Sequence, residues 1–326
     1  MKIGIPRGLG YYMYHPLWKG FFESLGTHVV FSDPTNKEIL DKGTLHCVDE
    51  ACLPLKVYLG HILNLKNKVD MLFLPKLTSV NKGEYICPKF CSVPELVKSS
   101  INELPPTIYT NVDFHKNRSN LLKTVYEIGS PITSNKKVLK NAFNDGLNAL
   151  KDYRHKFSLD MLPLRESLSS TDFVKNEFPK KILVLGHSYV LYDHYLSMNL
   201  INKIHSFGFQ VITQDNMDFK HIKGLDFDRD KKIFWTLARH TLGSALCALN
   251  MDEVQGIVYL SSFGCGIDSV IAEIVERKIR RNTKKGFMLI NLDEHTGEAG
   301  LNTRIEAFID MIKWRQDYET NFSSHG

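Results

Sequence analysis

The chain has 326 residues, of which 43% are hydrophobic and 24% charged, and its formal net charge is +5. This is the composition of a globular protein, and the length suits about two domains. No stretch approaches the ~18 consecutive apolar residues of a membrane span, and the opening residues lack the apolar region of a signal peptide, so we expect a cytoplasmic protein that does not enter a membrane. The one dense basic run, at 278–285, is expected to be a solvated helix face and not a nucleic-acid surface.

Strands alternate with helices through the first third of the chain, as is typical of a parallel α/β sheet. The first helix is expected to end at Gly26, since glycine is favoured just past the last helical turn. The predicted elements are, in order, a strand at 3–6, a loop at 7–14, a helix at 16–25, a strand at 28–31, a helix through Gly60, a strand at 69–74, a loop with Cys87 and a strand at 107–109.

The second half of the chain repeats this plan, with Gly208 in the place of Gly26. Its predicted elements are a strand at 181–185, a loop at 186–194, a helix at 195–206, a strand at 209–213, a helix at 238–249, a strand at 256–260, a loop with Cys265 and a strand at 287–291. We therefore predict an α/β fold of two similar domains with parallel sheets.

The predicted domains are residues 1–115 and 179–326. They are joined by residues 116–178, which predict two helices, at 118–128 and 135–157, and then a polar linker rich in serine. A long helix at 298–318 is predicted near the end of the chain.

Glycines follow the first strand, but the known nucleotide fingerprints are missing. Gly8 and Gly10 are not followed by the third glycine of a dinucleotide-binding loop, and no G-x-x-x-x-G-K-[ST] sequence is present. These glycines are expected to serve tight turns or to face a ligand at the carboxyl ends of the strands.

Five of the six cysteines fall in three loops, and each loop precedes a predicted helix. They are Cys47 and Cys52, Cys87 and Cys91, and Cys265. Helix starts are indicated by Pro54 after Cys52, by the capping box Ser92 to Glu95, and by Asp268 or Ser269 after Cys265. A helix N-terminus favours the thiolate and offers free N–H groups, and both suit metal–sulfur chemistry.

The three loops are expected to lie at the carboxyl ends of parallel strands, where open α/β sheets place their sites. Cys52 and Cys87 belong to the first predicted domain and Cys265 to the second, so a ligand bound by all three must lie in the cleft between the domains. Gly264 and Gly266 allow a bulky group to approach the backbone beside Cys265.

The spacing of the cysteines alone leaves several roles open for them. Cys247, inside the apolar sequence ALCAL, is expected to be a small hydrophobic core residue. A structural zinc site from Cys47, Cys52, Cys87 and Cys91 is a second interpretation, although the C-x4-C and C-x3-C spacings are looser than a zinc knuckle. A lone thiol nucleophile has less support, since no single Cys–His pair stands out. A ferredoxin-type cluster motif also has less support, since neither cysteine spacing matches one.

Longer runs around these residues resemble a known family. They are IGIPRGLGYYMYHPLW, VDEACLPLKVYLGHI, EYICPKF, SSFGCGIDS and NLDEHTGEAGLNTRIEAFIDM. Together they resemble the acyl-CoA dehydratase activase-related family, which is linked to the 2-hydroxyacyl-CoA dehydratases and the double-cubane cluster proteins. The resemblance implies two Rossmann-like domains with an iron–sulfur cluster, [4Fe–4S] or double cubane, held between them by Cys52, Cys87 and Cys265. Similar sequences often carry Ala and Leu in place of Cys47 and Cys91, so these two look like additions to the ligand set.

The resemblance also implies a function. Larger relatives carry fused activase modules, which are ATPases that deliver single electrons at low potential. This chain resembles the remaining part, which implies an electron-accepting component reduced by a separate ATP-dependent activase as its electron donor. The implied activity is that of an anaerobic iron–sulfur dehydratase or reductase acting on an acyl-CoA or another small substrate. A homodimer is compatible with this interpretation, and the substrate is not identified by the sequence.

Polar residues near the same strand ends are candidates for catalysis. They are Glu50, Lys56, His187, Tyr189, Glu294 and His295, with Asp293 beside the last two. Ordinary structural roles are open for several of them, such as a helix cap for Asp293 or a surface position for Lys56. Two other functions also stay open: a non-catalytic electron carrier or accessory protein, and a zinc-stabilised binding module.

Overall fold

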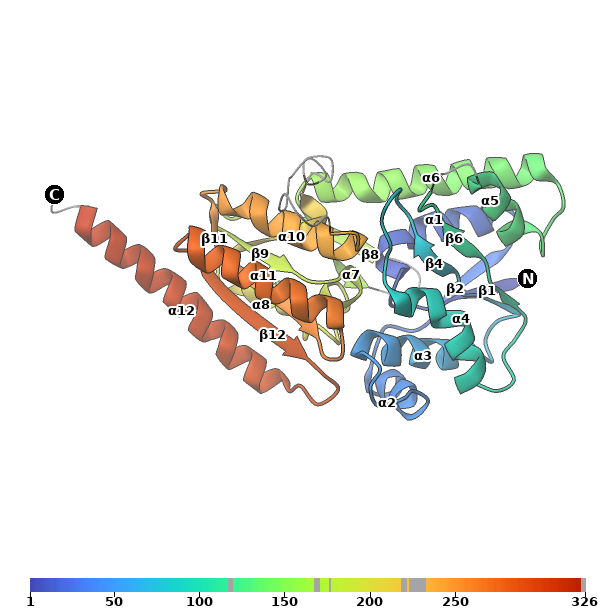
Figure 1. Cartoon of the computed structure of the whole chain (residues 1–326), viewed down its shortest axis with the longest axis horizontal. Helices are drawn as coiled ribbons and strands as arrows, with labels where there is room; N and C mark the ends of the chain where they lie inside the picture. Colours follow the sequence, from blue (N-terminus) through green and yellow to red (C-terminus); the bar gives the residue numbers. More distant parts are fainter. Residues whose placement is uncertain (117–119, 167–170, 176, 218–221, 223–232, 324–326) are drawn as a thin grey trace.

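The computed structural model describes residues 1–116, 120–166, 171–175, 177–217, 222 and 233–323. It contains two four-stranded parallel sheets, ordered β2-β1-β3-β5 and β10-β9-β11-β12, with helices packed on them (Figure 1). The predicted α/β class is therefore confirmed. We call the described parts of residues 1–158 the first lobe and those of residues 177–323 the second lobe. The predicted domain boundaries stay a prediction.

The first sheet forms from short apolar strands whose side chains are buried on both faces, as expected of a parallel sheet. Ile3 and Ile5 of β1, for example, have no exposed surface. The strands are β1 (Lys2–Ile5), β2 (His28–Phe31), β3 (Met71–Phe73) and β5 (Thr107–Ile108), and the helices around them are α1 (Tyr11–Ser24), α2 (Lys37–Leu45), α3 (Leu53–Leu65) and α4 (Pro88–Ser100). A small parallel pair, β4 (Lys76–Ser79) and β6 (Asn111–Asp113), extends beyond it.

The second sheet separates two apolar layers by the alternation of its strands. Ile182 and Val184 of β9 belong to the core that continues from the first lobe, whereas Leu183 and Leu185 belong to a second core under α10 and α11. The strands are β9 (Lys181–Leu185), β10 (Gln210–Thr213), β11 (Val254–Ser262) and β12 (Gly286–Leu292), and the helical elements are α7 (Ser188–Leu191), α8 (Leu200–Ser206), η1 (Gln214–Asn216), α10 (Thr236–Leu249), α11 (Gly266–Asn282) and α12 (Glu298–Ser323).

The connection contains the two predicted helices, α5 (Leu121–Gly129) and α6 (Lys136–Ser158). Helix α6 packs along α1, where the Tyr153 hydroxyl donates a hydrogen bond of 2.9 Å to the carbonyl of Tyr12. The predicted polar linker is wrong in part, because β7 (Met161–Glu166) and β8 (Thr171–Lys175) form an antiparallel pair there. The serine-rich stretch between these strands concealed the pairing, and its residues 167–170 lie outside the described part of the chain.

Several predicted boundaries shift. Helix α1 begins at Tyr11, so half of the predicted loop at 7–14 is helical, and α8 begins at Leu200 and not at 195. Helix α2 was not predicted; Asn36 caps it by accepting a hydrogen bond from the Ile39 N–H at 3.0 Å.

The two lobes meet along a polar and aromatic interface. Tyr85 pairs with Trp235 in an isolated parallel bridge, and the N–H of Tyr85 donates to the carbonyl of Phe234 at 2.8 Å. Nearby, Arg239 of the second lobe contacts Glu84 of the first at 3.1 Å. These contacts fix the orientation of the lobes on one side of the site described below.

Among the described residues, the structure contains no helix that is both long and apolar enough to cross a membrane.

Candidate functional site

Three cysteines occupy the same structural position in three different helices. Cys52, Cys87 and Cys265 are the N-cap residues of α3, α4 and α11. The prediction that each cysteine loop leads into a helix is confirmed, but the details differ. Helix α4 begins at Pro88, so Cys91 lies within its first turn and the predicted capping box at 92–95 is wrong.

The cap of α11 also differs from the expected one. The Cys265 thiol itself accepts from the N–H of Asp268 at 3.5 Å, so neither Asp268 nor Ser269 is the cap. The Asp268 side chain instead turns into the protein, where 2% of the residue is exposed.

The loop that carries Cys265 packs directly on the start of α3. The carbonyl of Phe263 accepts a hydrogen bond from the N–H of Leu53 at 3.4 Å. Gly264 has a φ of +76°, and a Cβ atom at this position would lie 3.0 Å from the Cα of Cys52. A glycine is required here by both its backbone conformation and the close approach of the two chain segments. Residues 213 positions apart in sequence, Cys52 and Cys265, are therefore neighbours across the lobes.

The third cysteine joins the other two around a buried tyrosine. Burial raises the pKa of the Tyr189 hydroxyl, and the charges of Cys265, Asp268, Cys52 and Cys87 raise it further. The Tyr189 ring lies beside that of His187, with 5.1 Å between the ring centroids. Its ring also packs near that of Phe90, one turn after Cys87 in α4, with 5.9 Å between the ring centroids.

Burial is the first cause of a raised pKa for each of the three thiols. For Cys265, the Asp268 carboxylate raises the pKa further, followed by Cys52 and Cys87. The charge of Cys87 also raises the pKa of Cys52, whereas the cysteine whose charge raises the pKa of Cys87 is Cys91. As free groups they are held neutral, and a positive metal centre would be needed to stabilise all three as thiolates.

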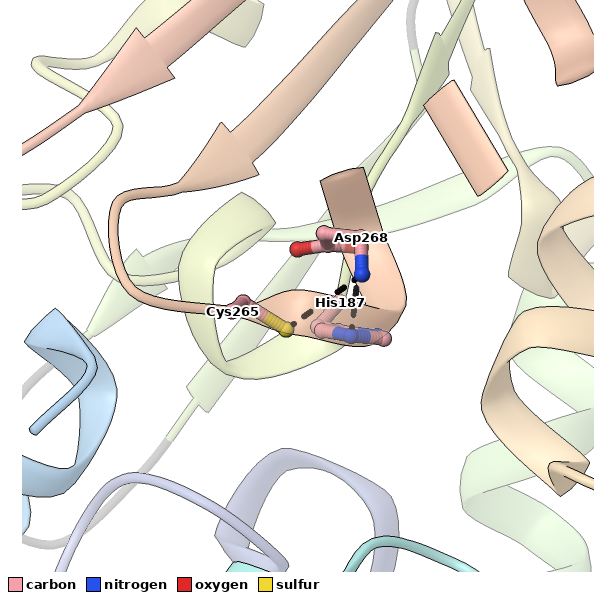
Figure 2. Close-up of side chains that lie close together, drawn as sticks. All are labelled: His187, Cys265 and Asp268. Carbon is pink, nitrogen blue, oxygen red and sulfur yellow. Dashed lines mark hydrogen bonds and ion pairs between the residues drawn. The ribbon is translucent and has the colours of Figure 1, made fainter. Parts of the chain in front are cut away.

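A second group of donors lies on the second-lobe side of the site (Figure 2). His187, Cys265 and Asp268 each place one potential ligand atom within 4.8 Å of the others. The Nε2 atom of His187 is 3.3 Å from Oδ1 of Asp268, which also accepts from the Tyr259 hydroxyl at 3.0 Å. The Nδ1 atom of His187 is buried and has no hydrogen-bond partner among the described residues.

Lys56 and Glu294 form an ion pair across the lobes. Lys56 lies at the end of the first turn of α3, and its Nζ donates to Oε1 of Glu294, just after β12, at 2.6 Å. The Lys56 side chain is 4% exposed and that of Glu294 is 19% exposed. The hydrogen bond from Lys56 is the main cause of the lowered pKa of Glu294. The alternative of a surface position for Lys56 is therefore wrong.

The other candidates lie further out. Glu50 and His295 are exposed. Asp293 accepts hydrogen bonds from the N–H of His295 at 2.9 Å and the hydroxyl of Thr296 at 2.8 Å, so it orders the turn before α12. The structure thus brings Lys56, His187, Tyr189 and Glu294 toward the three cysteines, while their roles stay predictions.

The remaining cysteines differ from the trio. Cys91 directs its sulfur at the hydroxyl of Thr78, 3.4 Å away, and at the carbonyl of Leu77. Cys47 is half-buried in the loop before α3, and Cys247 is half-buried in α10. Whether Cys47 or Cys91 binds a metal stays a prediction.

Sequence reasoning missed Asp268 as a member of the site. Its position three residues after Cys265 suggested a cap, and only the fold directs its carboxylate to His187 and Tyr259. The exposed Phe263, whose carbonyl joins the lobes, carried no signal in the sequence either.

Fold and site together define a two-lobed α/β protein with a cysteine-rich site where the lobes meet. The chain belongs to the family described as the CoA enzyme activase uncharacterised domain, whose model matches residues 2–217. This confirms the activase-related part of the resemblance. A comparison with functionally curated proteins gives no match.

The family membership corrects the expected function. The chain was expected to be an electron-accepting dehydratase component that receives electrons from a separate ATP-dependent activase. Both expectations are wrong, because the family is that of the activase itself and not of its partner. The error has a clear origin: the motifs identify a family, but they do not show whether that family activates another enzyme or is itself activated.

Proposed function

We propose that the chain is the redox component of an activator of a CoA-dependent enzyme, with an iron–sulfur cluster held between its lobes by Cys52, Cys87 and Cys265. The observation that carries this proposal is that three cysteines distant in sequence are each the N-cap of their own helix, and that the loop of Cys265 packs directly on Cys52 through Gly264. The family description supports the activating role. The link to dehydratases and double-cubane proteins belongs to this proposal.

The donor set fits a cluster better than a single thiolate-bound zinc ion. Zinc–sulfur bonds of about 2.3 Å bring the thiolates of one tetrahedral ion to within about 4 Å of each other. Among the described residues, the group of donors gathered within 4.8 Å is His187, Cys265 and Asp268, and not the three thiols. Ligands of a multi-iron cluster bind different iron atoms and are therefore spread further apart.

The surrounding residues suit an anionic group. Each of the three helices presents free N–H groups and the positive end of its dipole beside its cysteine. Such N–H groups hydrogen-bond cluster sulfurs and offset negative charge. Tyr189, Leu53 and Phe90 are buried around the thiols and exclude water.

The ion pair between Lys56 and Glu294 would keep the lobes closed over the site. An iron–sulfur cluster, when bound, would supply one-electron transfer. The protein's part is to hold three thiolates from two lobes in one place and to keep them away from water.

The proposal is tested by metal analysis of protein purified without oxygen. Iron and acid-labile sulfide should be present together in the wild type, with a broad visible absorbance. Cys52→Ser, Cys87→Ser and Cys265→Ser should each lose most of both, whereas Cys247→Ser should keep them. Full iron and sulfide content in all three variants would refute the assignment.

A second candidate is a mononuclear metal centre at His187, Cys265 and Asp268. It is favoured by the gathering of these three donors and by the unpartnered Nδ1 of His187. Cysteine, histidine and carboxylate are zinc ligands, so this centre would contain zinc without sulfide. His187→Gln would then remove the metal, while Cys52→Ser and Cys87→Ser would retain it.

A further inference from the structure

A large cavity lies apart from the cysteine site, beneath α1, α5 and α6. Its volume is about 890 Å³, and none of the three cysteines lines it. Its walls are mainly apolar and aromatic, as shown by Phe21 of α1, Val125 of α5, and Phe143 and Leu150 of α6. A volume of this size is in the range of small-molecule binding sites.

One end of this cavity is polar and is built by the second lobe. Ser188, Asp215 and Thr236 line it. Oδ2 of Asp215 accepts hydrogen bonds from the Ser188 hydroxyl at 3.1 Å and the Tyr192 hydroxyl at 2.7 Å. The Thr236 hydroxyl is buried, with 7% of the residue exposed, and has no hydrogen-bond partner among the described residues.

The two ends of the cavity favour different chemical groups on a ligand. Natural cores are close-packed, and apolar cavities much smaller than this one already destabilise a protein and take up apolar molecules. The hydrophobic walls therefore favour an alkyl or aromatic body. At the polar end, the Asp215 carboxylate favours a hydrogen-bond donor and opposes an anion. Arg154 also lines the cavity, but it is exposed and lies over the ring of Tyr14 at 5.8 Å.

We propose that this cavity binds an amphipathic small molecule with an apolar body and an uncharged, hydrogen-bond-donating head group. The body lies among the side chains of α1, α5 and α6, and the head group meets Asp215 and Thr236. This inference does not rest on the proposed cluster, because no cluster ligand lines the cavity.

Fluorescence titration of the full chain with N-phenyl-1-naphthylamine tests the site. This probe has an aromatic body and one N–H donor. We expect saturable binding of one probe per chain and displacement by dodecan-1-ol. Dodecanoate, with the same chain but an anionic head, should displace it at least about tenfold less effectively. No saturable binding, or equal displacement by both compounds, would overturn the proposal.

Two variants locate the site within the chain. Val125→Trp fills the cavity from α5 and should weaken probe binding more than tenfold. Leu122→Trp, at an exposed position of the same helix, is the matched control and should bind as the wild type does. Equal binding by both variants would overturn the proposed location.

Asp215→Asn supplies a test that does not depend on a large side chain being accommodated. Removing the carboxylate should improve displacement by dodecanoate about tenfold and leave that by dodecan-1-ol little changed. If the two compounds displace the probe with the same relative efficiency in this variant as in the wild type, Asp215 does not select the head group and the proposal fails.

Discussion

The Nζ atom of Lys56 lies 2.6 Å from Oε1 of Glu294, and this pair joins residues 238 positions apart. Lys56 sits one turn beyond Cys52 in α3, and Glu294 follows the last strand of the second sheet. The pair thus links the helix that carries one proposed ligand to the opposite lobe. The side chain of Lys56 is more buried than that of Glu294, so the two residues are expected to differ in the stability lost when each is replaced.

Removing either partner should destabilise the protein, but by different amounts. Glu294→Gln leaves the buried Lys56 charge without its counterion and should cost about 3 kcal/mol. Lys56→Met leaves Glu294, which reaches solvent more readily, and should cost about 1–2 kcal/mol. Urea unfolding at pH 7 measures both values. A larger cost for Lys56→Met would contradict the assigned burial.

The same pair predicts a loss of stability in acid. Lys56 lowers the pKa of Glu294 in the folded protein. The stabilisation is therefore present above the unfolded pKa of about 4.3 and is lost as the pH falls through the lower folded value. The difference in unfolding free energy between wild type and Glu294→Gln should shrink between pH 5 and pH 3. A constant difference over this range would show that the pair does not titrate as proposed.

A buried histidine should add a second acid sensitivity at higher pH. Burial lowers the pKa of His15 to about 3, while its Nδ1 lies 3.1 Å from the carbonyl of Tyr11. The unfolded chain binds a proton at His15 near pH 6.5, whereas the folded chain does not bind it until the pH falls to about 3. Below that pH the unfolding free energy should fall by about 1.4 kcal/mol per pH unit from this residue alone. His15→Phe keeps the ring packing against Tyr11 and should make the unfolding free energy less dependent on pH between pH 6 and pH 4. An unchanged pH dependence in this variant would contradict the role assigned to His15.

Gly264 should be intolerant of a side chain although it lies at the surface. Gly264→Ala forces a residue with a Cβ into a left-handed conformation and places that atom against Cys52. We expect a loss of about 1–3 kcal/mol in stability and a lower metal content. Gly266→Ala is the matched control, because a Cβ there meets no atom within 4 Å. Similar metal contents in the two variants would show that the contact with Cys52 does not shape the site.

Much of the fold was predictable because the strands are short and apolar, and because glycines mark the ends of helices between them. Gly26 and Gly208 do lie just past the ends of α1 and α8, both with positive φ. The pairing of β7 with β8 was not predictable, since Pro163 and the serines between the strands favour a linker. Helix starts shifted where a cysteine, a poor capping residue, took the N-cap position.

The site was predictable only as a set of helix starts. The expected position of Cys52, Cys87 and Cys265 before helices follows from the local sequence, and their closeness follows from the sheet topology. The contact of Asp268 with His187 depends on the tertiary fold of the second lobe, and the contact of Glu294 with Lys56 depends on how the lobes meet; no local pattern encodes either. The predicted function was wrong because the motifs identify the family but do not show whether it activates another enzyme or is itself activated.

The most direct test of the central claim is the iron and sulfide content of wild-type protein and Cys265→Ser, both purified without oxygen. We predict at least about four iron and four sulfide ions per wild-type chain, as one [4Fe–4S] cluster requires, and a loss of most of both in the variant. Zinc without sulfide in the wild type, or an unchanged content in Cys265→Ser, would contradict the proposal that thiolates from both lobes share one cluster.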